Sequence, residues 1–244
     1  MATKKSQRIA IWVIAGVMMV GTVGGFVAMM VAPGNEARDQ AEIEKANEEY
    51  SAKYKEYNDK KTAQEKQYQD AITAKAQELG LNEKYFAELS SYSSRVSSFD
   101  KNTVTELKTE DLKVGDGEEI KADSKVAMYY IGWNPEGKVF DQSIDGDKLK
   151  NPLPIDGVDE AEVIAGWKEG LIGMKVGGVR EIAIPSDKAY GASGSGEDIP
   201  ADTPIKFVVL AIPSLGVNKP EPIAEPEMPK ILKDFYKRQY GVDF

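Results

Sequence analysis

The distribution of glycine and proline divides this chain into parts that must fold differently. Residues 35–79 contain neither, and Ala, Glu, Lys and Gln, all good helix formers, dominate there. From about Val104 onward, Gly, Pro and Asp recur at intervals of roughly 8–12 residues, between short β-branched and aromatic runs. That spacing is typical of antiparallel β structure. The sequence therefore predicts a long helix followed by a compact, mainly β domain.

The long helix is highly charged and has few apolar residues. Residues 35–80 hold 11 acidic and 8 basic residues, with favourable i,i+4 pairs such as Glu56/Lys60. A row of tyrosines approximates a coiled-coil seam: Tyr50, Tyr54, Tyr57 and Tyr68. A self-associating stalk and a solvated spacer are both open interpretations. A short helix over residues 82–89 and a Ser-rich linker complete a predicted stalk-and-linker region, 35–103.

An uncharged run precedes the helix. Ile9–Ala32 would span ~36 Å as a helix, against ~30 Å of bilayer hydrocarbon. Lys4, Lys5 and Arg8 precede the run, which favours a cytoplasmic N-terminus. A cleaved signal peptide is the alternative, although its apolar region is normally only ~7–15 residues. We expect a single-pass membrane anchor within residues 1–34, with the remaining chain outside the cytoplasm.

The compact domain is expected to span residues 104–216 and to be α+β. Candidate strands are Lys125–Gly132, Val179–Pro185 and Ile205–Ile212, and in the last of these Ile205, Phe207, Val209 and Ala211 share one face. One short helical pattern places Val163, Ile164, Trp167 and Leu171 on one side. The predicted fold is a curved antiparallel β-sheet around one short helix, preceded by the transmembrane helix and the helical stalk.

Composition excludes several kinds of chemistry. The chain has no His and no Cys, which rules out imidazole acid/base catalysis and thiol catalysis. Without those residues a zinc or transition-metal site is not expected, and no cofactor is expected either. The net charge of −9 argues against a nucleic-acid partner, which needs clustered Lys and Arg. The remaining candidate is an apolar site with a few polar groups.

Five motifs follow one another in the compact domain. They are Tyr-Tyr-Ile-Gly (129–132), Gly-Lys-Val-Phe-Asp (137–141), Val-Ile-Ala-Gly-Trp-Lys-Glu-Gly (163–170), Ala-Tyr-Gly-Ala (189–192) and Ile-Lys-Phe (205–207). In this order they resemble the FKBP-type peptidyl-prolyl cis-trans isomerases over about residues 104–215. The resemblance implies proline-containing polypeptide substrates and binding of macrolide inhibitors.

The resemblance also implies a site, a hydrophobic cup. Trp167 would be its floor, and Tyr130, Phe140 and Phe207 its walls. The backbone N–H of Ile164 and the hydroxyl of Tyr190 would hold substrate carbonyls, and Asp141 would stand beside the aromatic wall. Further apolar residues implied to line the cup are Val163, Ile164, Leu153, Ile155 and Ile199.

The chain departs from the family pattern around this cup. The family often pairs the acidic residue with a nearby Arg, whereas Lys148 is the nearest base here. Asp198 stands where the family commonly has an apolar residue, and Ser195 where it can have His. These departures predict a less firmly held Asp141 and weaker macrolide binding or altered substrate choice.

The sequence thus predicts a membrane-anchored prolyl isomerase that assists the folding of extracytoplasmic proteins. Rotation about an X–Pro amide breaks no covalent bond, so an apolar cup can catalyse it by binding the twisted amide. One alternative is a non-catalytic module that binds proline-containing segments. Another is a chaperone whose apolar surface lies in the stalk or the tail.

The C-terminal region, 217–244, is expected to be a Pro-rich linker and an amphipathic tail. Residues 217–229 are rich in Pro and Glu, which indicates an extended linker. Residues 230–244 combine apolar and aromatic residues with Lys and Arg. A helix here could dock on its own protein, on a partner or on an anionic membrane.

Overall fold

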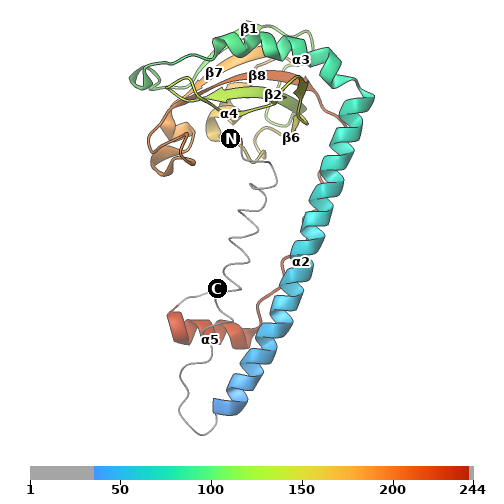
Figure 1. Cartoon of the computed structure of the whole chain (residues 1–244), viewed down its shortest axis with the longest axis vertical. Coiled ribbons are helices and arrows are strands. Elements are labelled where there is room, and N and C mark those ends of the chain that lie inside the picture. The colour runs from blue at the N-terminus through green and yellow to red at the C-terminus, as the bar shows by residue number, and fades with distance from the viewer. Residues whose placement is uncertain (1–35, 242–244) are drawn as a thin grey trace. The chain divides into compact units, whose positions relative to one another are not determined.

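The computed structural model describes residues 36–241, which form two compact units (Figure 1). One unit is Gln67–Lys219, and the other contains residues 36–66 and 220–241. The helices are α2 (Glu36–Glu78), α3 (Leu81–Ser91), α4 (Ala165–Leu171) and α5 (Lys230–Tyr240). The strands are β1 (Lys108–Lys113), β2 (Lys125–Trp133), β3 (Val139–Gln142), β4 (Ile144–Asp145), β5 (Lys148–Leu149), β6 (Leu153–Asp156), β7 (Val179–Ile184) and β8 (Ile205–Pro213).

The centre of the larger unit is an antiparallel sheet. Its order is β1-β7-β8-β2-β3, and β6 pairs with the first half of β2. The three predicted strands are confirmed as β2, β7 and β8. In the register of β2 and β8, Gly132 lies opposite Phe207 and Tyr130 opposite Val209. This register brings two of the predicted motifs, more than 70 residues apart in sequence, to the same part of the sheet.

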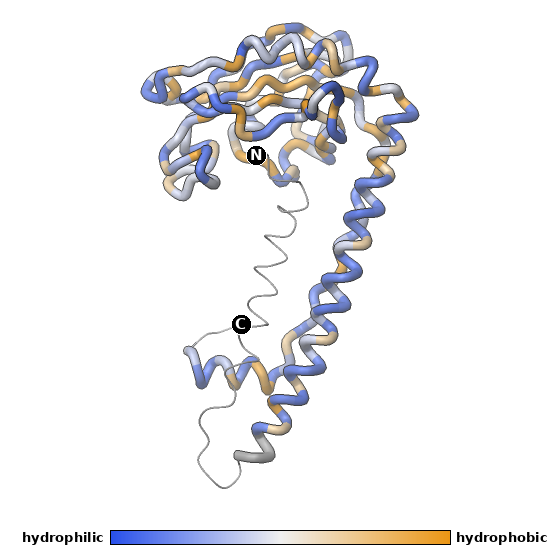
Figure 2. Tube along the Cα trace, viewed as in Figure 1, coloured by the Kyte–Doolittle hydropathy of each residue, from blue (hydrophilic) through white to orange (hydrophobic). Residues whose placement is uncertain are grey.

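The sheet has two apolar faces, and its central strands β2 and β8 are mostly hydrophobic (Figure 2). Helix α2 is mostly hydrophilic in the same view. On β8 the predicted face is confirmed: Ile205, Phe207, Val209 and Ala211 belong to one core cluster together with Trp167. Alternate residues Val208, Leu210 and Ile212 belong to a second cluster on the other face. This alternation is the period-2 geometry of a strand buried on both sides.

Helix α4 packs on the first face through two glycines. A Cβ on Gly166 would lie 2.3 Å from Ile184 Cγ2, and a Cβ on Gly170 would lie 2.8 Å from Ile182 Cγ2. Glycine at these positions lets the helix backbone lie close against β7. The helix begins at Ala165, so Val163 and Ile164 precede it rather than belonging to its apolar side as the pattern predicted.

Helix α3, predicted as a short helix over 82–89, and the end of α2 cover the second face. Ile72, Leu81, Tyr85 and Leu89 are buried in one cluster with Tyr129 and Trp133 of the sheet. Burial and the neighbouring Tyr85 raise the pKa of Tyr129. Residues 67–103 are thus packed against the sheet, and the compact unit starts well before residue 104.

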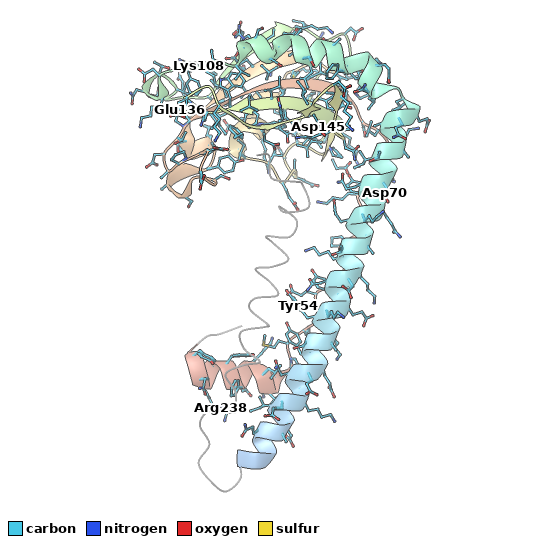
Figure 3. The ribbon with its side chains drawn as sticks, in the orientation of Figure 1. Tyr54, Asp70, Lys108, Glu136, Asp145 and Arg238 are labelled. Atoms are coloured by element: carbon cyan, nitrogen blue, oxygen red, sulfur yellow. The ribbon has the colours of Figure 1, made fainter. Side chains whose placement is uncertain are left out.

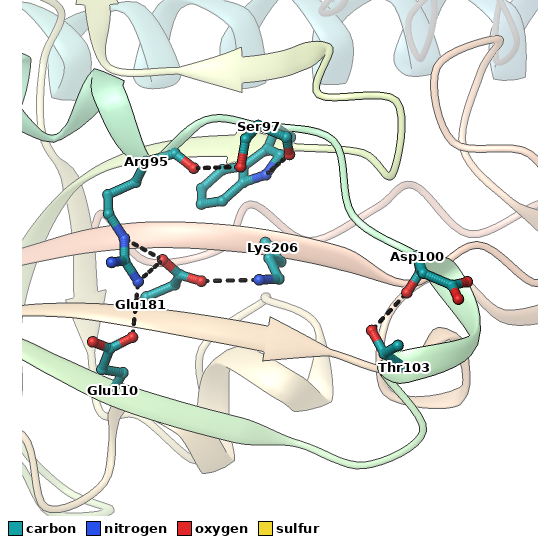
Figure 4. A network of polar contacts seen from close by, with 8 residues as sticks. Arg95, Ser97, Asp100, Thr103, Glu110, Glu181 and Lys206 are labelled. Carbon is teal, nitrogen blue, oxygen red and sulfur yellow. Dashed lines mark hydrogen bonds and ion pairs between the residues drawn. The ribbon is translucent and has the colours of Figure 1, made fainter.

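The segment after α3, predicted as a Ser-rich linker, is fixed to the sheet by polar contacts (Figure 4). Trp133 Nε1 donates a hydrogen bond of 3.1 Å to Ser97 O. Arg95 Nε donates to Glu181 Oε2 at 2.8 Å, and Lys206 Nζ donates to Glu181 Oε1 at 3.1 Å. Glu181 is buried, and burial of a carboxylate is costly unless cationic or hydrogen-bonding partners accompany it.

The smaller unit contains the N-terminal part of α2 and the C-terminal region. Gln64 Nε2 donates a hydrogen bond of 2.9 Å to Glu221 O of the linker. Leu232 of α5 is 1% exposed, and Tyr236 of the same helix lies near Tyr50. The predicted tail helix is therefore present and packs on its own chain. Figure 3 shows the side chains of this region around the labelled Tyr54 and Arg238.

The tyrosine row of α2 has neighbours within the chain. The rings of Tyr50 and Tyr54 lie 5.9 Å apart, and those of Tyr54 and Tyr57 lie 5.7 Å apart. Burial and the charge of Glu225 in the linker raise the pKa values of Tyr50 and Tyr54. These contacts within one chain give no support to the interpretation of the stalk as a self-associating helix.

The predicted membrane-spanning architecture requires correction. Within residues 36–241, no helix combines the length and the apolar character needed to cross a bilayer. The 43-residue α2 is long enough but is too rich in charged side chains. The predicted span, Ile9–Ala32, lies outside the described residues. The absence of such a helix among the described residues contradicts the predicted fold with a transmembrane helix. It equally gives no support to a single-pass membrane localisation with the domain outside the cytoplasm.

Candidate active site

Four aromatic rings meet on the α4 face of the sheet. The ring centroids of Trp167 and Phe207 are 5.2 Å apart, and those of Tyr130 and Trp167 are 5.3 Å apart. Phe140 lies 5.5 Å from Phe207. All three pairs are edge-to-face, the arrangement that aromatic quadrupoles prefer. Trp167 and Phe207 are nearly fully buried, while Tyr130 and Phe140 are half-buried, so the set is an aromatic cup with partly accessible walls.

A carboxylate is attached to one wall of this cup. Tyr130 Oη donates a hydrogen bond of 2.7 Å to Asp141 Oδ2, and the backbone N–H of Gln142 donates to Asp141 Oδ1 at 3.0 Å. The expectation that Asp141 would be less firmly held for want of a nearby Arg is not what the structure shows. A tyrosine hydroxyl and a backbone amide hold it instead.

The other predicted site residues differ in how deeply their side chains are buried. Ile155 and Ile199 are 2% and 3% exposed and belong to the same core cluster as the rings. Leu153, Val163 and Ile164 are half-buried and pack against that cluster. Tyr190 is not in the cluster: its side chain is 37% exposed, and it follows Ala189, which does pack there. The structure thus brings together every predicted apolar residue and leaves Tyr190 more accessible.

Two further residues, Ser143 and Asn134, support the cup, and no sequence pattern predicted this role. Ser143, which is 3% exposed, accepts a hydrogen bond of 2.9 Å from Tyr130 N and donates its own N–H to Tyr130 O at 2.8 Å. Asn134, which is 4% exposed, joins the β2–β3 turn to the loop that precedes Ile199. Both are small polar residues beside the aromatic motifs, a pattern that also fits ordinary turn positions.

Gly132 allows the rings to approach the backbone of β2. A Cβ at this position would lie 2.4 Å from Phe207 Cε1 and 2.9 Å from Phe140 Cζ. We therefore expect Gly132→Ala to displace both rings and to destabilise the domain by about 1–3 kcal/mol, as overpacking does. Chemical denaturation measures this change. Gly146→Ala, with open space around the Cβ but a positive φ of 64°, is the control for backbone strain without ring displacement.

Residues 116–211 match the family model described as FKBP-type peptidyl-prolyl cis-trans isomerase. The FK506-binding protein of Neisseria meningitidis serogroup B is 41% identical over 100 residues, which cover 41% of this chain and 88% of that protein. The chain belongs to the FKBP-type isomerase family. Its enzyme class is peptidyl-prolyl cis-trans isomerase, or rotamase. The resemblance inferred from the five motifs is confirmed, without support for a membrane-anchored form.

Other FKBP-type proteins match a similar share of the chain. FK506-binding protein 4 of Rhizopus delemar is 41% identical over 100 residues, and the chain spans only a quarter of that protein's length. Among solved structures, the peptidyl-prolyl cis-trans isomerase of Pseudomonas syringae matches 43% of this chain and 73% of its own, at 36% identity and a TM-score of 0.38.

Proposed function

We propose that the aromatic cup binds the proline ring of an X–Pro segment and accelerates rotation about the preceding amide. The observation that carries this proposal is the edge-to-face packing of the rings of Tyr130, Phe140, Trp167 and Phe207 on one face of the sheet, with two of the four rings partly exposed. A prolyl ring is compact and apolar, so it suits an aromatic wall. The folding helper role follows from the reaction, because X–Pro isomerisation is a slow step for many folding chains.

Catalysis in this proposal comes from preferential binding of the twisted amide. The barrier to amide rotation is ~18–20 kcal/mol, and much of it is resonance that polarises the planar C–N unit. A twisted amide has lost that resonance and is less polar, so a dry aromatic surface favours it over the planar ground state. Interactions stronger in the transition state than in the ground state raise the rate, and no proton transfer is required.

Three polar groups would orient the substrate. By the family resemblance, the Ile164 N–H and the Tyr190 hydroxyl would donate hydrogen bonds to substrate carbonyls. The partial exposure of Tyr190 suits contact with a peptide that arrives from solvent. Asp141 is fixed by Tyr130, and in this role it places negative charge beside the carbon atom of the rotating amide. We propose these three as orienting groups around the apolar walls.

The test is an isomerisation assay with a Leu-Pro or Phe-Pro peptide and the full chain. We expect acceleration, and we expect Tyr130→Phe to lower kcat/KM about tenfold, because loss of a hydrogen bond to a charged group costs about 1.5 kcal/mol. Tyr129→Phe, a neighbouring hydroxyl on the opposite face, serves as the matched control. Peptide binding without any rate effect would instead identify a recognition module.

Macrolide binding is part of the same proposal. The names of the Neisseria and Rhizopus relatives state that they bind FK506. We expect FK506 to compete with the peptide for the cup of this chain. Asp198 stands where the family commonly has an apolar residue and Ser195 where it can have His, so we expect weaker inhibition than in relatives that keep those residues. Inhibition curves measured with the same peptide test this expectation.

A further inference from the structure

The loop that follows Tyr190, residues 191–199, is compact and is closed by hydrogen bonds within itself. Ser195 N donates a hydrogen bond of 2.7 Å to Ile199 O, and Gly194 N donates to Gly191 O at 3.3 Å. A Cβ on Gly194 would lie 2.4 Å from Ile199 O, so only glycine fits this close approach. We call residues 191–199 the cup loop, because Ile199 at its end is 3% exposed and packs in the core cluster of the four rings.

The buried side chain of Asn134 connects the cup loop to the β2–β3 turn. Its Nδ2 donates a hydrogen bond of 2.9 Å to Asp198 O, the carbonyl immediately before Ile199. Its Oδ1 accepts from Lys138 N at 2.9 Å, and its backbone N–H donates to Lys138 O at 3.1 Å. The side-chain amide of Asn134 needs its NH2 group toward the loop and its oxygen toward the turn, so these contacts determine its orientation.

We infer that Asn134 is a positioning residue that holds the cup loop over the aromatic cup and thereby sets substrate preference. This inference rests on the proposed function, and it adds which residue fixes the rim of the site. The same turn leads directly into β3, which carries Phe140 and Asp141. One side chain therefore couples the loop that ends in Ile199 to the strand that carries one wall of the cup.

A second contact between turn and loop is weaker. Lys138 Nζ and Asp198 Oδ1 form an ion pair, and the hydrogen bond to Asp198 raises the pKa of Lys138. The two side chains are 62% and 35% exposed, and exposed ion pairs contribute little because water screens them. Asn134 is 4% exposed, so its hydrogen bonds act in a medium of low dielectric. The buried amide is thus the main attachment.

The position of the loop explains why preference should depend on this attachment. If the prolyl ring occupies the space between the four rings, groups at the rim meet the residues that flank the proline. In the cup loop, Ile199 is buried against the cluster of the four rings, while Ser195 and Glu197 are exposed polar residues that a flanking residue could meet. A displaced loop would change contacts with the flanking residues while it leaves the aromatic walls in place. Misplacement of about 1 Å can lower a rate by up to about a hundredfold.

The experiment compares the full chain with Asn134→Asp and Asn134→Ala, using Ala-Pro, Leu-Pro and Phe-Pro peptides. Asn134→Asp keeps the shape but loses the donor to Asp198 O, and Asn134→Ala loses it without adding charge. We expect both to lower kcat/KM by about ten- to a hundredfold, to a different extent for each peptide. We also expect faster hydrogen exchange at Ser195 N–H, with exchange at Val208 N–H of the central strand unchanged.

Asn151→Asp is the matched control, since Asn151 Nδ2 donates to Thr73 Oγ1 at 2.8 Å, away from the cup. Its peptide preference should equal that of the unmodified chain. Lys138→Met should have a smaller effect than either Asn134 variant.

Unchanged kcat/KM and preference in both Asn134 variants would overturn the inference. An unmodified chain that isomerises none of the peptides would instead overturn the proposed function, and unaltered exchange at Ser195 would then also reject the attachment.

Discussion

A fragment of residues 104–219 is expected to be far less stable than a fragment of residues 67–219. The shorter fragment lacks Ile72, Leu81, Tyr85 and Leu89, which are buried against the second face of the sheet. Each fully buried side chain of this size contributes about 1.5–3 kcal/mol. The sum is comparable with the 5–15 kcal/mol that normally stabilises a whole domain. We therefore expect the shorter fragment to aggregate or to unfold at ambient temperature, as thermal denaturation would show.

Two leucines provide a matched test of the same point within the longer fragment. Leu89 of α3 is 0% exposed, whereas Leu79 between α2 and α3 is 47% exposed. Leu89→Ala should lower the free energy of unfolding by about 2–5 kcal/mol, as truncation of buried leucines does. Leu79→Ala should change it by no more than about 0.5 kcal/mol. Equal effects of the two substitutions, or a shorter fragment as stable as the longer one, would show that α3 is not part of the folded domain.

Phe140→Ala is expected to reduce kcat/KM about a hundredfold. Phe140 is a half-buried wall of the cup, and its ring contacts that of Phe207 at 5.5 Å. Loss of an aromatic wall removes about 3 kcal/mol of packing, which would be missing from the transition state. Each 1.36 kcal/mol corresponds to a factor of ten in rate. The peptide isomerisation assay measures this loss directly.

Phe99→Ala is the control for that substitution. Phe99 is half-buried and packs against the cluster on the opposite face of the sheet, with Lys206 Nζ 5.1 Å from its ring centroid. It loses the same atoms as Phe140→Ala without touching the cup, so its kcat/KM should stay near that of the unmodified chain. If the Phe140→Ala protein is folded and its kcat/KM is unimpaired, Phe140 is not part of the site.

Much of the cup could be predicted because its residues sit in local patterns. Alternation along 205–212 identified the face that carries Phe207, and the order of five motifs identified the family and its aromatic residues. The contacts that Asn134 makes could not be predicted, because its partner Asp198 is 64 positions away and is bonded through a backbone oxygen. A sequence pattern does not specify which carbonyl a loop presents.

Residues 92–103 show the same limit. Their serines and polar residues are typical of a linker, yet hydrogen bonds hold them on the sheet. Trp133 donates to Ser97 O, and Arg95 donates to Glu181. The membrane prediction failed for a different reason. It relied on an apolar run and the three basic residues before it, which lie outside the described residues, and no helix of the described residues could cross a membrane.

The sequence by itself determined the helix of residues 36–78, the three central strands and the apolar, His-free character of the site, since these depend on neighbours within a few residues. Tertiary structure decided how the site is assembled. Pairing of β2 with β8 places Gly132 opposite Phe207, and the glycines of α4 let Trp167 reach the same cluster. Burial of the second face by α3 was likewise decided only in the folded chain, because an apolar strand does not specify which helix will cover it.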